Sequence, residues 1–181
     1  MRIDAFIAGT TGAWRIRRTE AIAGTGLDMA SHLRVVHGST GGPFPDCTWL
    51  LRGAASHARY ATRSELTRLA EVQPGLGRPE ATMAVMIPIS KSAPWWDLAQ
   101  DERRAIFDES SHHTQIGMDY LPAIARKLYH ARDLDEAFDF LTWFEFAPEH
   151  EGSFDRLLER LRSTVEWKYV EREVEVRLLR I

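Results

Sequence analysis

The alternation of hydrophobic and polar positions is clearest in the second half of the chain. Residues 81–89 form a short apolar segment typical of a buried strand, and residues 95–117 place their apolar side chains at helical spacing. Residues 123–131 and 138–146 then alternate with a period of two, as strands with two different faces do. These segments predict the order strand, helix, strand, strand.

The pattern continues to the end of the chain. After Pro148, apolar positions recur at the i, i+3, i+4, i+7 spacing of an amphipathic helix, and residues 169–181 alternate again as a strand. One face of that last strand is apolar and the other carries Glu173, Glu175 and Arg177. The resulting order, β-α-β-β-α-β, is that of a ferredoxin-like unit.

The first half of the chain gives a weaker pattern, divided by glycine-rich breaks. We expect a short helix at residues 27–36 and strands at residues 6–9, 13–18 and 47–53. These elements would suit an abbreviated second copy of the same α+β unit. The chain is therefore predicted to have an N-terminal half at residues 1–78 and a C-terminal half at residues 79–181.

Composition removes several classes of function. The 181 residues are 44% hydrophobic and 27% charged, as in ordinary globular proteins, and the net charge of -3 argues against a nucleic-acid partner. A single cysteine, Cys47, excludes an internal disulfide framework and a thiolate metal cluster. The N-terminus has no signal-peptide pattern, and no window approaches the ~20 apolar residues that a membrane span needs. We therefore expect a cytoplasmic protein without a membrane partner.

Two adjacent histidines, His112 and His113, are candidates for metal binding. Neighbouring residues point in different directions, so one of them could bind a haem iron as a single axial ligand, but not both together. Such a ligand needs its second ring nitrogen held by a carboxylate, and Glu166 is a candidate for that contact. The alternatives are histidines at the surface or at a helix end, and an ordinary glutamate at a helix end.

Arg126 stands within the apolar alternation of residues 123–131. On two adjacent strands, Leu128, Thr142 and Phe144 would share its face and surround one guanidinium with a mostly dry wall. A dry pocket with one fixed cation suits a small anion. A structural arginine paired with a carboxylate is the alternative.

Three further residues, Lys91, Trp95 and Tyr60, are weaker candidates for a rim that binds carboxylate groups. A lysine or tyrosine at the end of a strand is usually only solvated. The other histidines, His130 among them, are scattered and are expected to be solvated or in the core.

Long stretches of the sequence resemble the chlorite dismutase family in its short form. The resemblance is carried by YLPAIARKLYHARDL at residues 120–134, FDFLTWFE at residues 138–145 and the tail RLRSTVEWKYVEREVEVRL at residues 160–178. It implies a dimeric α+β barrel of two ferredoxin-like halves, the N-terminal one abbreviated, with haem b in the C-terminal half. The extended N-terminal region of the longer members is missing, which favours a homodimer over a pentamer.

The resemblance also implies roles for individual residues. His113 matches the ligand of the haem iron, Glu166 its hydrogen-bond partner, and Arg126 the arginine on the opposite face of the haem. Leu128, Thr142 and Phe144 match the wall beside that arginine, and Gln73 matches a residue that can meet its side chain. The haem propionate side is matched by Tyr60, Lys91 and Trp95, and less securely by Arg59.

The implied activity is the haem b-dependent conversion of chlorite to chloride and dioxygen, with formation of an O–O bond. Two alternatives remain. A coproheme decarboxylase has the same fold but normally lacks an arginine at the position of Arg126. A non-catalytic haem-binding protein would use the barrel as a scaffold only.

Overall fold

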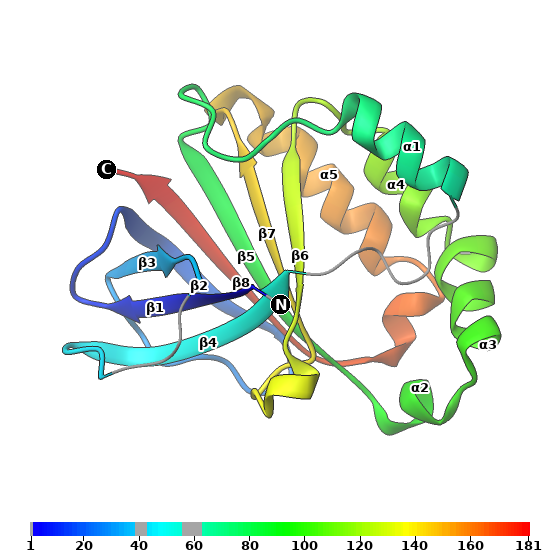
Figure 1. The fold of residues 1–181 in the computed structure, drawn as a ribbon, viewed down its shortest axis with the longest axis horizontal. Coiled ribbons are helices and arrows are strands. Elements are labelled where there is room, and N and C mark those ends of the chain that lie inside the picture. Colours follow the sequence, from blue (N-terminus) through cyan, green and yellow to red (C-terminus); the bar gives the residue numbers. More distant parts are fainter. Residues whose placement is uncertain (1, 39–42, 56–62) are drawn as a thin grey trace.

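The computed structural model describes residues 2–38, 43–55 and 63–181, which form a closed barrel of eight antiparallel strands (Figure 1). Around the barrel the strands follow the order β1-β3-β2-β8-β5-β7-β6-β4. Their bounds are Ile3–Gly9 (β1), Trp14–Ala23 (β2), His32–Val36 (β3), Cys47–Ala55 (β4), Met83–Lys91 (β5), Ala125–His130 (β6), Phe140–Phe146 (β7) and Val170–Arg180 (β8). The strands of each half of the chain therefore stay together, and the halves join at two seams, β2 with β8 and β4 with β6.

The helices cover one side of the barrel. They are α1 (Arg63–Val72), α2 (Ala93–Asp97), α3 (Gln100–Arg104), α4 (His113–Met118) and α5 (Glu151–Arg162), with a π-helical turn at Ala105–Ser110 and 3₁₀ turns at Arg132–Leu134, Pro148–His150 and Glu166–Tyr169. Figure 1 shows α5 lying across β5, β6 and β7, with α1, α3 and α4 beside it. The order in the second half is the expected β-α-β-β-α-β.

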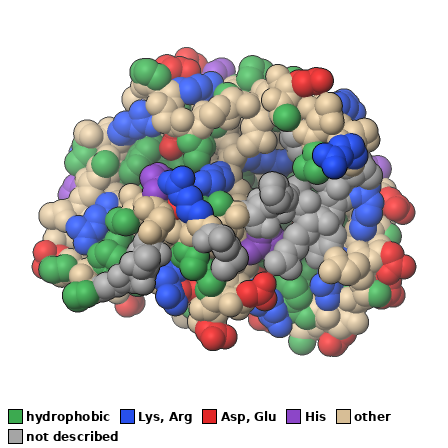
Figure 2. Space-filling model, in the orientation of Figure 1, with side chains coloured by type: hydrophobic (Ala, Val, Ile, Leu, Met, Phe, Trp, Pro, Cys, Tyr) green, Lys and Arg blue, Asp and Glu red, His purple; other side chains and the backbone are tan. Residues whose placement is uncertain are grey.

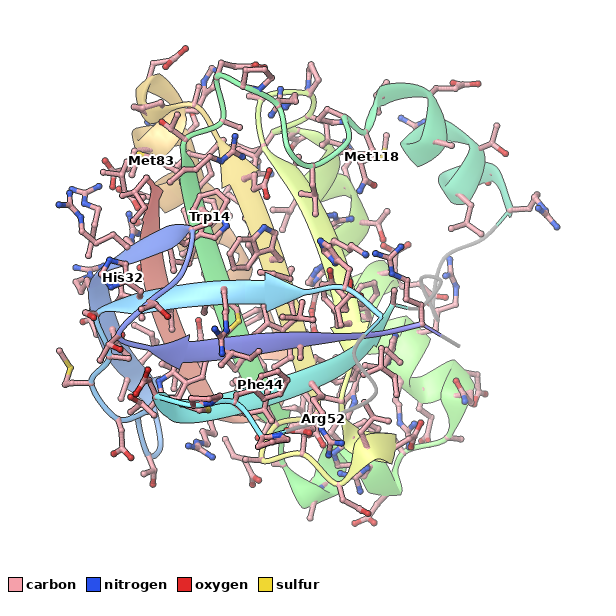
Figure 3. The ribbon with its side chains drawn as sticks, turned by 60° about the vertical axis from the view of Figure 1, so that its left-hand side comes forward. Trp14, His32, Phe44, Arg52, Met83 and Met118 are labelled. Atoms are coloured by element: carbon pink, nitrogen blue, oxygen red, sulfur yellow. The ribbon has the colours of Figure 1, made fainter. Side chains whose placement is uncertain are left out.

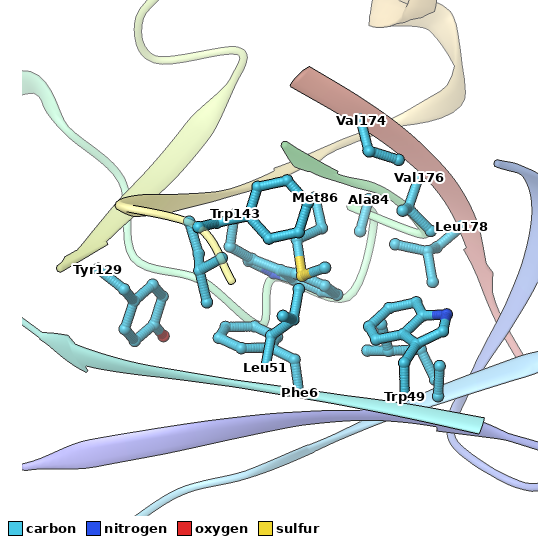
Figure 4. Packing of buried hydrophobic residues seen from close by; sticks show 14 of the residues in the cluster. Phe6, Trp49, Leu51, Ala84, Met86, Tyr129, Trp143, Val174, Val176 and Leu178 are labelled. Carbon is cyan, nitrogen blue, oxygen red and sulfur yellow. The ribbon is translucent and has the colours of Figure 1, made fainter. Parts of the chain in front are cut away.

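The interior of the barrel is a packed apolar core. Phe6 of β1 contacts the rings of Tyr129 and Trp143, at centroid distances of 5.1 and 5.7 Å (Figure 4). Strands β1, β3 and β4 run across β5, β6 and β7 in Figure 3, so the core is enclosed between the two sets of strands. Such a core fills the barrel with side chains and leaves the outer face of β5–β7 to the helices.

The expected alternation of β6 and β7 is confirmed. Tyr129, Leu141 and Trp143 point into the barrel core. Their neighbours of opposite parity face the helices, where Phe144 and Phe146 pack with Phe154 of α5. One sequence pattern thus separates the packed interior from the face that carries the helices.

The first half of the chain differs from expectation. Residues 32–36, expected to be helical, form β3 and pair with both β1 and β2. The adjacent β-branched residues Val35 and Val36 favour a strand. Strand β1 pairs with all five residues of β3, and β2 pairs with His32 and Leu33. Helix α1 was not expected, and the boundary predicted between residues 78 and 79 lies between α1 and β5.

One expectation for the second half also needs correction, and the polar face of the last strand is buried. The single helix expected over residues 95–117 is interrupted by the π-helical turn and by His112, whose φ of 51° is left-handed. Glu173 and Glu175, on the polar face of the last strand, are each only 1% exposed. Helix α5 covers that face, and Arg162 donates to both carboxylates at 2.6 and 2.7 Å, which offsets the cost of burying them.

No helix in the described parts of the chain combines the length and the apolar character needed to cross a membrane. On the face shown in Figure 2, basic and acidic side chains are interspersed among the described residues. That mixture agrees with the small net charge.

Candidate functional site

A cavity of about 580 Å³ lies between the outer face of β5–β7 and the helices. The sheet side carries Arg126, Leu128, Thr142 and Phe144, all of which line the cavity. Arg126 pairs in register with Phe144, and Leu128 with Thr142. The four residues expected to share one face therefore lie on one wall of the cavity, and Arg126 is the cation among the four.

His113 lines the cavity from the helix side, at the first position of α4. Its Nδ1 lies 2.7 Å from Oε2 of Glu166, which leaves Nε2 as the nitrogen able to bind a ligand. The imidazole is stacked on Phe107, with ring centroids 4.3 Å apart and planes at 21°. His112 is exposed and does not line the cavity, so the two histidines diverge as expected.

Glu166 is buried and holds two partners at once. Its Oε1 accepts from Nζ of Lys91 at 2.7 Å while its Oε2 meets His113. Burial alone would raise the pKa of this carboxyl, but the charges of His113 and Lys91 and their hydrogen bonds outweigh burial and lower the pKa to about 2. The carboxylate is therefore ionised at neutral pH and acts as a fixed anchor for the imidazole.

Lys91 and Trp95, candidates for a rim that binds carboxylate groups, do not lie in solvent. Both line the cavity but are buried, at 6% and 1% exposure. The ammonium of Lys91 lies 4.5 Å from the ring centroid of Trp95 and bonds to the carboxylate of Glu166. Lys91 thus already has a protein carboxylate as its partner, and the position of a lysine at the end of β5 could not reveal that.

The guanidinium of Arg126 has no hydrogen bond or ion pair with any side chain among the residues that the structure describes. Burial in the apolar wall lowers the pKa of Arg126, although an arginine remains charged at neutral pH. Gln73 was expected to meet this side chain, but its Nε2 instead donates to the backbone carbonyl of Arg126 at 2.7 Å. The guanidinium of Arg126 thus faces the cavity without a carboxylate partner among the described residues.

Other residues also line the cavity, although sequence reasoning assigned them no role in it. His130 and Phe140 are two of them. The alternation places His130 on the face of Arg126 and Phe140 on the face of Phe144, while His130 was expected only to be a solvated or core histidine. Trp167 also lines the cavity. Its Nε1 donates to the buried Glu173 at 2.8 Å, and no sequence pattern predicts this contact. Arg59 and Tyr60 lie outside the described residues.

The arrangement fits a flat cofactor held by one protein ligand. His113 offers one ring nitrogen to an apolar space, and its other nitrogen is held by an ionised carboxylate. No group of three or more His, Cys, Asp or Glu side chains that could hold a metal ion occurs within residues 2–38, 43–55 and 63–181. One ring nitrogen facing an apolar space is what an axial haem ligand requires.

Sequence comparisons with known proteins all point to one family. A sequence model of the family described as chlorite dismutase matches residues 27–179. The curated chlorite dismutase of Ideonella dechloratans is 38% identical over 86 residues, which cover 48% of this chain and 28% of that protein. The matched segment thus spans little more than a quarter of that relative's length.

Solved structures match over nearly the whole chain. The dimeric chlorite dismutase from Nitrobacter winogradskyi is 54% identical with a TM-score of 0.91, covering 98% of this chain and 99% of that one. A mutant chlorite dismutase from Candidatus Nitrospira defluvii is 21% identical with a TM-score of 0.69, covering 99% of this chain and 91% of that one. The second likeness is one of fold alone.

Proposed function

The chain belongs to the chlorite dismutase family, and on that premise we propose that it is a haem b-dependent enzyme that converts chlorite to chloride and dioxygen. The observation that carries the proposal is the apolar cavity with His113 on its helix side and Arg126 on its sheet side. One group can hold a haem iron and the other can hold an anion. Few other activities need an iron ligand and a buried cation in the same apolar cavity.

In this proposal His113 holds the haem through Nε2. Glu166 and Lys91 form a buried chain behind the imidazole, with two contacts of 2.7 Å that fix the orientation of the ring. An anionic partner on Nδ1 makes the imidazole a stronger electron donor. The bound haem would supply the redox-active iron at which the oxygen atoms of chlorite are rearranged into dioxygen.

Arg126 is proposed to attract chlorite and to keep anionic species inside the cavity. Leu128, Thr142 and Phe144 exclude water around the guanidinium, which strengthens its attraction for an anion. Retention would matter because both oxygen atoms of the product come from one chlorite, so hypochlorite that left the cavity would carry one of them away. Gln73 would support this role through the backbone of Arg126.

Arg126 also distinguishes chlorite chemistry from the alternatives. Burial of an arginine without a carboxylate partner among the described residues is costly, and a non-catalytic haem carrier would gain nothing from it. A coproheme decarboxylase would not require a cation at this position. The remaining expected residues, Arg59, Tyr60 and Trp95, are proposed to hold the propionate side of the haem.

We further propose a homodimer with one haem b in each chain. The Nitrobacter winogradskyi relative is described as dimeric and is similar over 98% of this chain. A two-fold dimer is also the commonest closed assembly of identical chains. Light scattering at micromolar concentration should give about twice the chain mass of 20.7 kDa. A pentamer or an active monomer would contradict the proposal.

Haem binding is tested by titrating haem b into the purified protein and into two variants. His113→Ala should lose most of the Soret band, because it removes the imidazole that Glu166 orients toward the cavity. His112→Asn is the matched control, since asparagine tolerates the left-handed backbone at that position and should leave the Soret band nearly intact. The reverse pattern would show that the wrong histidine has been assigned.

Activity is tested by oxygen release from chlorite, with monochlorodimedone as a trap for hypochlorite. Arg126→Ala should keep its haem and turn over more slowly, because it loses about 2–4 kcal/mol of transition-state stabilisation. It should also release more hypochlorite, which the trap detects. Unchanged oxygen release with no extra trapping would reduce Arg126 to a structural residue. A wild-type protein that binds haem but releases no oxygen would overturn the proposed reaction.

A further inference from the structure

We infer that Gly117 is a positioning residue for Arg126, because the space left by its missing side chain is where the guanidinium rests. A Cβ placed on Gly117 would lie 2.8 Å from Nη1, 3.2 Å from Cζ and 3.4 Å from Nη2 of Arg126. These are the nearest atoms to that point, and all belong to the guanidinium. The cation of the cavity therefore lies against the backbone of α4.

The location of Gly117 connects the two sides of the cavity. It is buried in α4, four residues after His113, so both residues lie on the same face of that helix. Arg126 reaches this face from β6, on the opposite wall. The contact thus fixes the cation relative to the helix that begins at the candidate iron ligand.

Backbone geometry does not explain a glycine at this position. Gly117 is not among the residues with a positive φ, and glycine inside a helix is less favourable than alanine. Any residue could adopt this backbone, but only glycine leaves room for the guanidinium. No described side chain bonds that guanidinium, and its atoms fill the space that a side chain at Gly117 would take.

An added methyl group should move the cation without breaking the fold. The atoms it would meet are the far end of a long, flexible side chain, which can shift at small cost. Gly117→Ala should therefore fold normally and displace the guanidinium into the cavity or away from it. The consequence is a changed anion site, and this step rests on the proposed haem and anion function.

The anion site can be measured with azide, an anionic ligand of ferric haem, on the haem-reconstituted protein. Gly117→Ala should change the azide dissociation constant by at least tenfold, because a displaced donor no longer meets a bound anion in the same place. In the Arg126→Ala background the same substitution should have no further effect. Equal effects in both backgrounds, or none in the wild type, would overturn the inference.

A thermal cycle on the apoprotein tests the contact without haem. With the guanidinium removed, Gly117→Ala gains its full helix propensity and should raise the Tm by about 2–4 °C. In the wild-type background the gain should be smaller or absent, because the guanidinium must first move. Equal Tm shifts in both backgrounds would overturn the contact. Because no haem is involved, this arm stands even if the proposed function fails.

Two further variants keep the interpretation specific. Gly152 of α5 is the matched helical glycine, since its nearest outside atom, Nη1 of Arg156, is 3.8 Å from an added Cβ. Gly152→Ala should leave azide affinity unchanged and give the same Tm shift with or without Arg126. Arg126→Lys, which lacks the broad guanidinium, should make azide affinity insensitive to Gly117→Ala. Sensitivity that persists there would show that the methyl group acts through something other than the guanidinium.

Discussion

Two buried carboxylates, one from each half of the chain, have nearly the same partners but different surroundings. Asp4 of β1 meets Nδ1 of His37 at 3.0 Å and Nζ of Lys127 at 3.2 Å. Glu166 meets Nδ1 of His113 and Nζ of Lys91, both at 2.7 Å. His37 is exposed on the surface, whereas His113 opens onto the cavity. A carboxylate, a histidine and a lysine therefore do not make a site unless the free ring nitrogen faces an enclosed space.

The two clusters also differ in how exposed the partners of each carboxylate are. Lys127 and His37 are 33% and 54% exposed, while the side chain of Lys91 is only 5% exposed. Removing the negative charge of Asp4 would leave the ammonium of Lys127, which water can stabilise. Removing that of Glu166 would leave an ammonium buried without a counter-charge. This difference should appear in stability and in haem binding.

The largest effect is expected from Glu166→Gln. Because it leaves Lys91 buried and uncompensated, it should lower the free energy of unfolding by about 3–5 kcal/mol. Loss of the anionic partner of His113 should also weaken haem binding by about 10–100-fold. Urea unfolding of the apoprotein and Soret titration measure the two quantities. A loss no larger than that of Asp4→Asn would remove the distinction between the clusters.

Asp4→Asn should have a smaller effect and one confined to stability. Burial would raise the pKa of Asp4, but hydrogen bonds from His37, Gly38 and Lys127 outweigh it and lower the pKa from 3.8 to about 2. That shift corresponds to about 2 kcal/mol of stability at neutral pH. Haem affinity should stay within twofold of the wild type. A large loss of haem affinity would show that the Asp4 cluster supports the cavity.

The same carboxylate predicts how stability depends on acid. A depressed folded pKa means that the ionised form is the stabilising one, so the contribution of Asp4 is complete above about pH 4 and is lost as pH falls toward about 2. The stability difference between the wild type and Asp4→Asn should therefore shrink over that window. Urea unfolding of both apoproteins at several pH values measures it. A difference that does not change with pH would mean that Asp4 contributes through its shape and not its charge.

The sequence was sufficient for the second half of the fold because each strand there has a packed face and a face toward the helices. That alternation separates Tyr129 and Trp143, which lie in the barrel core, from Arg126 and Phe144, which lie on the cavity wall. In the first half, β3 was mistaken for a helix because its five residues are too short to show a period, and its pairing with β1 and β2 is decided by distant strands. A local sequence pattern cannot predict an element whose conformation is determined by pairing with distant strands.

The site was predictable only in part for the same reason. His113 and Arg126 belong to segments whose order resembles one family, so their meeting in one cavity could be expected. The burial of Lys91 depends on Glu166, 75 positions away along the chain, and no spacing rule relates the two. Gly117 gives no signal either, because an empty space beside a guanidinium exists only in three dimensions.

The smallest effect is expected from Lys127→Met, which removes the cation of the Asp4 cluster that corresponds to Lys91. Lys127 is partly exposed, and the worth of such ion pairs is about 0–1 kcal/mol. Asp4 would keep its contacts with His37, with the backbone N–H of Gly38 and with the hydroxyl of Tyr129, so its charge would stay satisfied. Stability at neutral pH should therefore fall by less than in Asp4→Asn, as urea unfolding can measure. A loss as large as that of Asp4→Asn would mean that one lysine holds the cluster together, and that the two carboxylates resemble each other more closely than their exposure suggests.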